Sequence, residues 1–115
     1  MKKRILIVED ERALWTQIRD VLGTDSYDLE WVQTGHEAVR RSLDSSFDVI
    51  VVDTELSDVD PWKVLECLSR LHPFVAIVAI VQDNEESALA SLAGAGACVS
   101  KPVDRRTVFK AVQRV

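Results

Sequence analysis

The 115-residue sequence predicts a single α/β domain, residues 1–115, in which a parallel sheet is covered by helices on both faces. The first observation is a series of short apolar runs, rich in valine and isoleucine, that are typical of buried parallel strands. The second is that segments with the apolar spacing of a helix alternate with these runs. Strand and helix repeated in this way form a parallel sheet with right-handed crossovers, so helices cover both of its faces.

The rest of the chain is organised around residues 47–53, FDVIVVD, an apolar run that ends on Asp53 and continues into a polar loop. We expect a fully buried strand with Asp53 at its carboxyl end. In open α/β sheets, ligands bind at that end of the strands, beside the point where the strand order reverses. Asp53 is therefore the first candidate site residue.

A second buried strand is predicted at residues 4–8, and it ends in the acidic turn Glu9, Asp10 and Glu11. A helix follows, and Gly23 ends it. A loop that binds phosphate directly needs glycine, serine or threonine to present backbone donors. An acidic turn would repel a bare phosphate unless a cation bound first.

The remaining segments continue the alternation. They are an edge strand at residues 27–32, a helix at 36–43, a helix at about 61–71, a strand at 75–81, a helix from Asp83 to about Ala93, a strand at 97–100 and a helix that begins at Asp104. Pro61 suits the first turn of its helix, where a missing N–H has no effect, and Asp83 with Glu86 forms a capping-box pattern. We expect the third helix to pack on the sheet through Val64, Leu65, Leu68 and Leu71.

With residues 27–32 at an edge, the most economical strand order is 2-1-3-4-5, the flavodoxin-like order. The first and third strands are then neighbours, so that Glu9, Asp10 and Asp53 converge at one edge, and Lys101 arrives from the end of the fifth strand. Three crowded carboxylates need a compensating charge, which a divalent cation and the lysine would supply. The alternative is that these acids only cap helices, but two clusters on adjacent strands together with Lys101 favour a site.

Composition excludes several classes of function. The net charge of −5 argues against direct binding of nucleic acid, which requires a basic surface. The apolar run near the N-terminus is too short for a signal peptide, and no segment is long enough to span a bilayer. Cys67 and Cys98 have neither metal-ligand nor redox spacing, so we expect two reduced thiols and a cytoplasmic protein.

Three stretches, ILIVEDE, the strand that ends in Asp53, and AGAGACVSKP, closely resemble those of bacterial response-regulator receiver domains, and the match covers essentially the whole chain. The resemblance implies two-component signalling by a phosphoacceptor that is not an enzyme with turnover. Asp53 would take a phosphoryl group from a histidine kinase, a phosphotransfer protein or a small phosphodonor.

The resemblance also implies the other site residues. Glu9 and Asp10, together with Asp53 and the backbone carbonyl of Glu55, match the ligands of Mg²⁺. Lys101 matches the lysine that pairs with the phosphoryl oxygens, and its bond to the following proline is expected to be cis. A C-terminal effector domain beyond the chain is a further partner that the resemblance allows.

Two positions depart from the family pattern. Counting back from Lys101, Ala79 stands where the family has a switch threonine or serine at the end of the fourth strand, and Cys98 stands where it has a switch aromatic. The two changes leave the phosphorylation pocket chemically whole, but they affect the signalling response to phosphorylation. One alternative is therefore a pseudo-receiver, an interaction module that is independent of phosphate. A hydrolase of haloacid-dehalogenase type is disfavoured, because Glu55 replaces its second aspartate and no cap domain is present.

Overall fold

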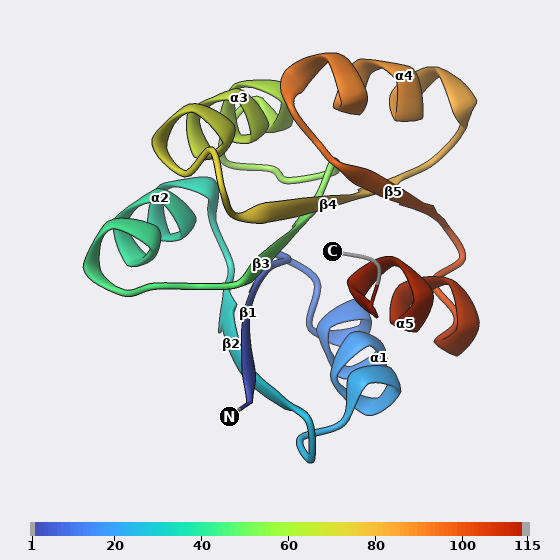
Figure 1. Ribbon diagram of the computed structural model, residues 1–115. Coiled ribbons are helices and arrows are strands. Elements are labelled where there is room, and N and C mark those ends of the chain that lie inside the picture. The colour runs from blue at the N-terminus through green and yellow to red at the C-terminus, as the bar shows by residue number, and fades with distance from the viewer. Residues whose placement is uncertain (1, 114–115) are drawn as a thin grey trace.

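The computed structural model describes residues 2–113, without the side chain of Arg105, and these residues form a five-stranded parallel sheet flanked by helices (Figure 1). The strand order is β2-β1-β3-β4-β5, which confirms the predicted fold class and order. The strands are β1 (Lys3–Val8), β2 (Tyr27–Val32), β3 (Val49–Asp53), β4 (Ala76–Val81) and β5 (Ala97–Ser100). The helices are α1 (Arg12–Leu22), α2 (Gly35–Asp44), α3 (Pro61–Leu71), α4 (Asn84–Ala93) and α5 (Arg105–Gln113).

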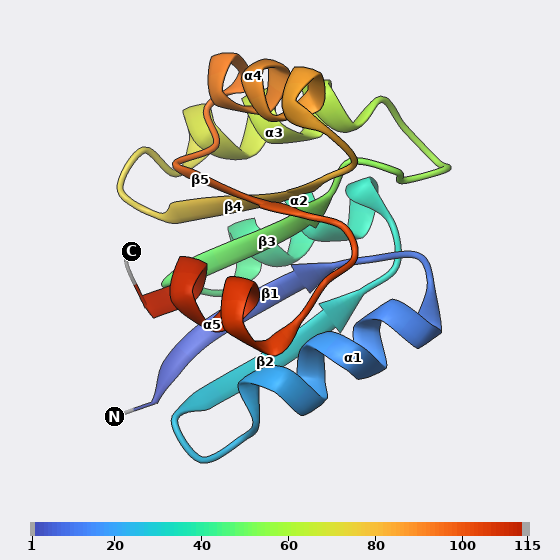
Figure 2. The same ribbon diagram turned by 90° about the vertical axis from the view of Figure 1, so that its right-hand side faces the viewer.

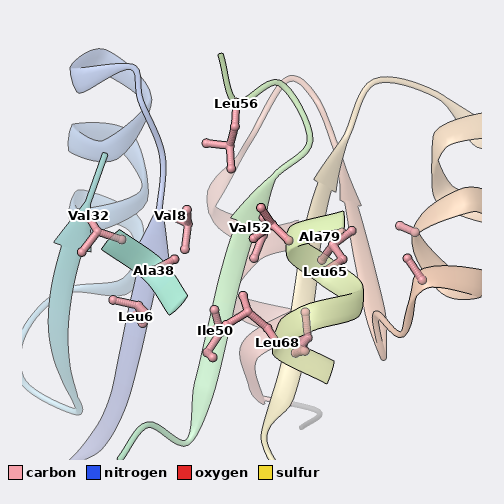
Figure 3. Close-up of a cluster of buried hydrophobic side chains, with 14 of the residues drawn as sticks. Leu6, Val8, Val32, Ala38, Ile50, Val52, Leu56, Leu65, Leu68 and Ala79 are labelled. Atoms are coloured by element: carbon pink, nitrogen blue, oxygen red, sulfur yellow. The ribbon is translucent and has the colours of Figure 1, made fainter. Parts of the chain in front are cut away.

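The sheet separates two hydrophobic cores. Helices α1 and α5 cover one face, and α2, α3 and α4 cover the other (Figure 2). Because successive side chains of a strand point to opposite faces, β1 and β3 contribute alternate residues to each core. Figure 3 shows the second core, where Leu65 and Leu68 of α3 pack against the sheet near Ile50 and Val52.

Polar side chains begin three of the helices. Thr34 accepts a hydrogen bond from the Glu37 N–H at the start of α2, and Asp60 accepts one from the Trp62 N–H at the start of α3. Asp83 accepts the Glu86 N–H at the start of α4, as the capping-box pattern predicts. In a capping box the Glu86 carboxylate would in return accept the N–H of Asp83, but here it accepts the N–H of Gln82.

The edge strand β2 carries its charges in ion pairs. Arg41 of α2 donates to both carboxylate oxygens of Glu30, from Nε at 2.5 Å and from Nη2 at 2.9 Å. The hydrogen bond from Arg41 lowers the pKa of Glu30. Arg4 of β1 lies 3.5 Å from Asp28. These side chains fix α2 and β1 against the edge of the sheet.

One expectation needs correction. Leu71, the last residue of α3, is 44% exposed, so the buried face of that helix ends at Leu68. Strand β4 continues past Ala79 to Val81, and Asp53 is in register with Ile80. Ala79 is fully buried, two residues before the end of this strand, and its switch role stays a prediction.

No helix within residues 2–113 has the length and apolar character needed to cross a membrane.

Candidate functional site

The carboxyl ends of β1 and β3 bring two carboxyl groups together. Val8 is in register with Val52, so the residues that follow them, Glu9 and Asp53, are neighbours at the sheet edge. The side chains of both are buried, Glu9 fully and Asp53 with 1% exposed. Asp53 accepts the Glu55 N–H on Oδ1 at 2.9 Å, which leaves Oδ2 directed toward the fifth strand.

Glu9 is a buried acid without a cationic partner of its own. One carboxylate oxygen, Oε2, accepts the Glu11 N–H at 3.1 Å, and Oε1 receives no hydrogen bond from any group in residues 2–113. Burial, together with the hydrogen bond and negative charge of Asp53, raises the pKa of Glu9 to about 9. Glu9 therefore keeps its proton to a higher pH than an exposed carboxyl group does.

Lys101 supplies positive charge from the end of β5. Its backbone N–H donates to the carbonyl of Val81 at 2.9 Å, which fixes it beside the end of β4. Its Nζ donates to Asp53 Oδ2 at 3.1 Å and also to the Glu55 carboxylate. Burial alone would lower the pKa of Lys101, but the hydrogen bonds to Glu55 and Asp53 outweigh it and raise that pKa. The Lys101–Pro102 peptide is cis, as expected.

Asp10 lies at the rim of the site and faces the loop that contains Ser57. Its Oδ2 accepts the backbone N–H of Ser57 at 3.1 Å and the Ser57 hydroxyl at 2.8 Å. In the range 2–113, no three side chains of aspartate, glutamate, histidine or cysteine are already grouped as a metal site. The structure thus brings Glu9, Asp53 and Lys101 together, while Asp10 binds Ser57 through Oδ2.

The donor set nevertheless fits Mg²⁺. This ion prefers hard oxygen ligands and keeps several waters, so a few carboxylates suffice to hold it. The unpartnered Oε1 of Glu9 and the raised pKa of that group beside Asp53 both indicate that two ionised carboxylates here would lack a compensating positive charge. A cation would supply that charge.

A model of the response regulator receiver domain family matches residues 5–113. The chain belongs to this family. Among relatives of this receiver domain, the transcriptional activator protein IrlR of Burkholderia pseudomallei is 32% identical over 102 residues, 88% of this chain and 44% of the relative. The alkaline phosphatase synthesis transcriptional regulatory protein PhoP of Bacillus subtilis is 28% identical over 117 residues, 100% of this chain and 49% of the relative. The chain thus spans about half the length of these relatives.

Solved structures agree with the fold. The chemotaxis response regulator CheY4 of Vibrio cholerae superposes with a TM-score of 0.90 at 21% identity, over 99% of this chain and 98% of that one. A CheY-like receiver domain protein of Methanospirillum hungatei also has a TM-score of 0.90, at 27% identity, over 99% of this chain and 93% of that one. Both likenesses extend over nearly the whole of this chain.

A second layer of polar residues in this receiver domain was missed by sequence reasoning. The buried Thr54 hydroxyl lies 2.9 Å from the Ile80 carbonyl and 2.9 Å from Oε1 of Glu86. Gln82, after the end of β4, donates its side-chain amide to Glu55. The position of Thr54, directly after the candidate nucleophile Asp53, was only a weak sign that this residue belongs to the site. Nothing local marked Gln82, because its partner is 27 residues away in sequence.

The two predicted switch positions sit on the face toward α4. Cys98 is partly buried, and its Sγ lies 3.7 Å from the carbonyl of Ser87 in α4. Val81, the last residue of β4, is buried and has no hydroxyl, and neither has Ala79. Neither Ala79 nor Val81 therefore supplies the hydroxyl that the family has at the end of β4. The switch roles of Ala79 and Cys98 stay predictions.

Proposed function

We propose that this receiver domain accepts a phosphoryl group on Asp53 from a histidine kinase or phosphotransfer protein, in a reaction that depends on Mg²⁺. The observation that carries the proposal is the placement of Asp53. Oδ1 is held by a backbone N–H, while Oδ2 lies 3.1 Å from the ammonium of Lys101. A carboxylate oriented in this way beside a cation suits in-line phosphoryl transfer, which requires positioning and charge neutralisation more than a strong base.

In the transfer, an oxygen of Asp53 attacks the phosphorus and forms a new P–O bond. The P–N bond of phosphohistidine breaks on the opposite side, and the imidazole leaves with the bonding electrons; with an acyl phosphate, a P–O bond breaks and a carboxylate leaves. Lys101 pairs with an oxygen of the transferred group. Glu9, Asp10, Asp53 and the Glu55 carbonyl would hold Mg²⁺, which when bound would neutralise charge on the phosphoryl oxygens.

The test is incubation with Mg²⁺ and a small acyl phosphate, followed by mass spectrometry of the intact protein. We expect a gain of one phosphoryl group in the wild type and none in Asp53→Asn. Asp25→Asn, at an exposed aspartate outside the site, is the matched control and should be modified like the wild type. A wild type that stays unmodified would exclude the proposal.

That outcome would favour the second candidate, a pseudo-receiver that binds a partner without phosphorylation. The absence of a hydroxyl at Val81, the end of β4, is the observation that supports it. Steady turnover of a phosphoester would instead indicate a hydrolase, whereas we propose a stoichiometric phosphoacceptor.

The proposal extends to the cellular setting. The two cysteines are free thiols, which suits the reducing cytoplasm. The net charge of −5 supports a domain that does not itself contact nucleic acid. Because relatives about twice as long are named as transcriptional regulators, we propose that an output domain accompanies this receiver in the whole protein.

A further inference from the structure

We propose that Glu55 and Gln82 form a clasp over Lys101, and that this clasp must open before Asp53 accepts a phosphoryl group. The inference rests on the proposed function and assigns a role to two side chains outside the phosphoacceptor. Gln82 is a positioning residue that acts through Glu55. The clasp is defined as the side chains of Glu55, Gln82 and Lys101.

The contacts run outward from the buried nucleophile. Asp53 is 1% exposed and binds Lys101, whose side chain is 20% exposed. Lys101 in turn binds the carboxylate of Glu55, which is 49% exposed. The amide of Gln82 donates to the same Glu55 oxygen, Oε1, that the lysine contacts. Glu55 is therefore held from two sides, by a cation from β5 and by an amide from the end of β4.

Gln82 is itself anchored. Its backbone N–H donates to Oε1 of Glu86 at 2.8 Å, and that oxygen also lies 2.9 Å from the hydroxyl of Thr54. Thr54 directly follows Asp53 and is buried. The position of Gln82 is thus set by the first turn of α4 and by the end of β3, and its amide holds Glu55 from a defined place.

The chemistry makes Glu55 a competitor of the incoming group. A phosphoryl oxygen and the Glu55 carboxylate are both anionic acceptors for the ammonium of Lys101. When the phosphoryl group binds the lysine, Glu55 would lie beside a like charge. The carboxylate must therefore swing outward, which its half-exposed position permits. Removal of its charge should make Lys101 available and speed the uptake of phosphate.

The experiment measures the initial rate of phosphoryl uptake from acetyl phosphate with saturating Mg²⁺, by intact-protein mass spectrometry. We expect Glu55→Gln to raise the rate by about two- to fivefold, the size typical of one partly exposed ion pair. Gln82→Ala should raise it by a smaller factor. The double variant should match Glu55→Gln alone, because Gln82 acts only through that carboxylate. Glu85→Gln removes an equal charge from an exposed position in the first turn of α4 and is the matched control, with an unchanged rate.

A second readout follows the lysine itself. In the protein without donor, the ¹⁵N shift of the Lys101 ammonium should change in Glu55→Gln, change in the same direction in Gln82→Ala, and stay constant in Glu85→Gln. A loss of packing would not produce this pattern. Melting temperatures of all variants establish that each is folded.

The outcomes separate this inference from the proposed function. Uptake on Asp53 that is equally fast or slower in Glu55→Gln, or additive effects of Glu55→Gln and Gln82→Ala, would overturn the clasp alone. No uptake by either protein would overturn the proposed function, and the role of the clasp in transfer with it.

Discussion

Replacement of Lys101 by alanine should slow phosphoryl uptake by a magnitude that follows from the geometry. The ammonium lies 3.1 Å from Oδ2 of Asp53, and 20% of the lysine side chain is exposed. A hydrogen bond to a charged group contributes about 1.5–3 kcal/mol. Because each 1.36 kcal/mol changes a rate tenfold, Lys101→Ala should lower the rate constant by about 10- to 150-fold. The loss should fall on the transfer step, since we propose that Lys101 pairs with the moving phosphoryl group.

The assay is the time course of mass gain with acetyl phosphate and Mg²⁺ at several donor concentrations. Lys63→Ala, at an exposed lysine of α3, removes the same charge from elsewhere and should leave the rate constant unchanged. Lys101→Arg keeps the charge with a different shape and should recover part of the rate. If Lys101→Ala stays within twofold of the wild type, the phosphoryl group does not pass beside Lys101, and our assignment of its role is wrong.

Three further predictions concern the metal, the switch and the edge of the sheet. Mg²⁺ should bind weakly to the free protein and more tightly with a phosphate mimic, and Asp10→Ala should abolish both effects in an NMR titration; unchanged binding would contradict the ligand assignment. A phosphate mimic should shift the amides of residues 87–92 only slightly in the wild type and more in Ala79→Thr; a full wild-type shift would refute this. Glu30→Gln should lower the melting temperature at neutral pH. The lowered pKa of Glu30 stabilises the folded protein at pH values above the pKa that this group has in the unfolded chain. The difference in melting temperature between the two proteins should vanish as the pH falls through the folded-state pKa. A difference that persists in acid would show that Glu30 acts through packing.

Most of the fold could be predicted because its signals are local. The apolar run at 75–81 became β4, and Asp60 with Pro61 marked the start of α3 as the structure has it. Local patterns do not show where neighbouring elements stop covering a helix. Leu71 continues the apolar spacing of α3, but it lies beyond the part of the helix that neighbouring elements cover and is therefore exposed.

The candidate site was predictable only as far as the backbone determines it. Glu9 and Asp53 meet because their strands are adjacent and in register. The direction of an exposed side chain depends on segments far away in sequence. Asp10 binds Ser57, 47 residues later, and Glu55 meets Gln82 across 27 residues.

The tryptophan pair gives the protein an optical reporter of its own site. Trp31 of β2 donates its indole N–H to the backbone carbonyl of Glu9 at 2.7 Å and stacks on Trp15 of α1, with ring centroids 5.4 Å apart. Any event that moves Glu9 therefore changes the polarity around a stacked chromophore. With Trp62 replaced by phenylalanine to remove the background emission, stopped-flow fluorescence would follow metal binding and phosphoryl transfer in real time, without an attached dye.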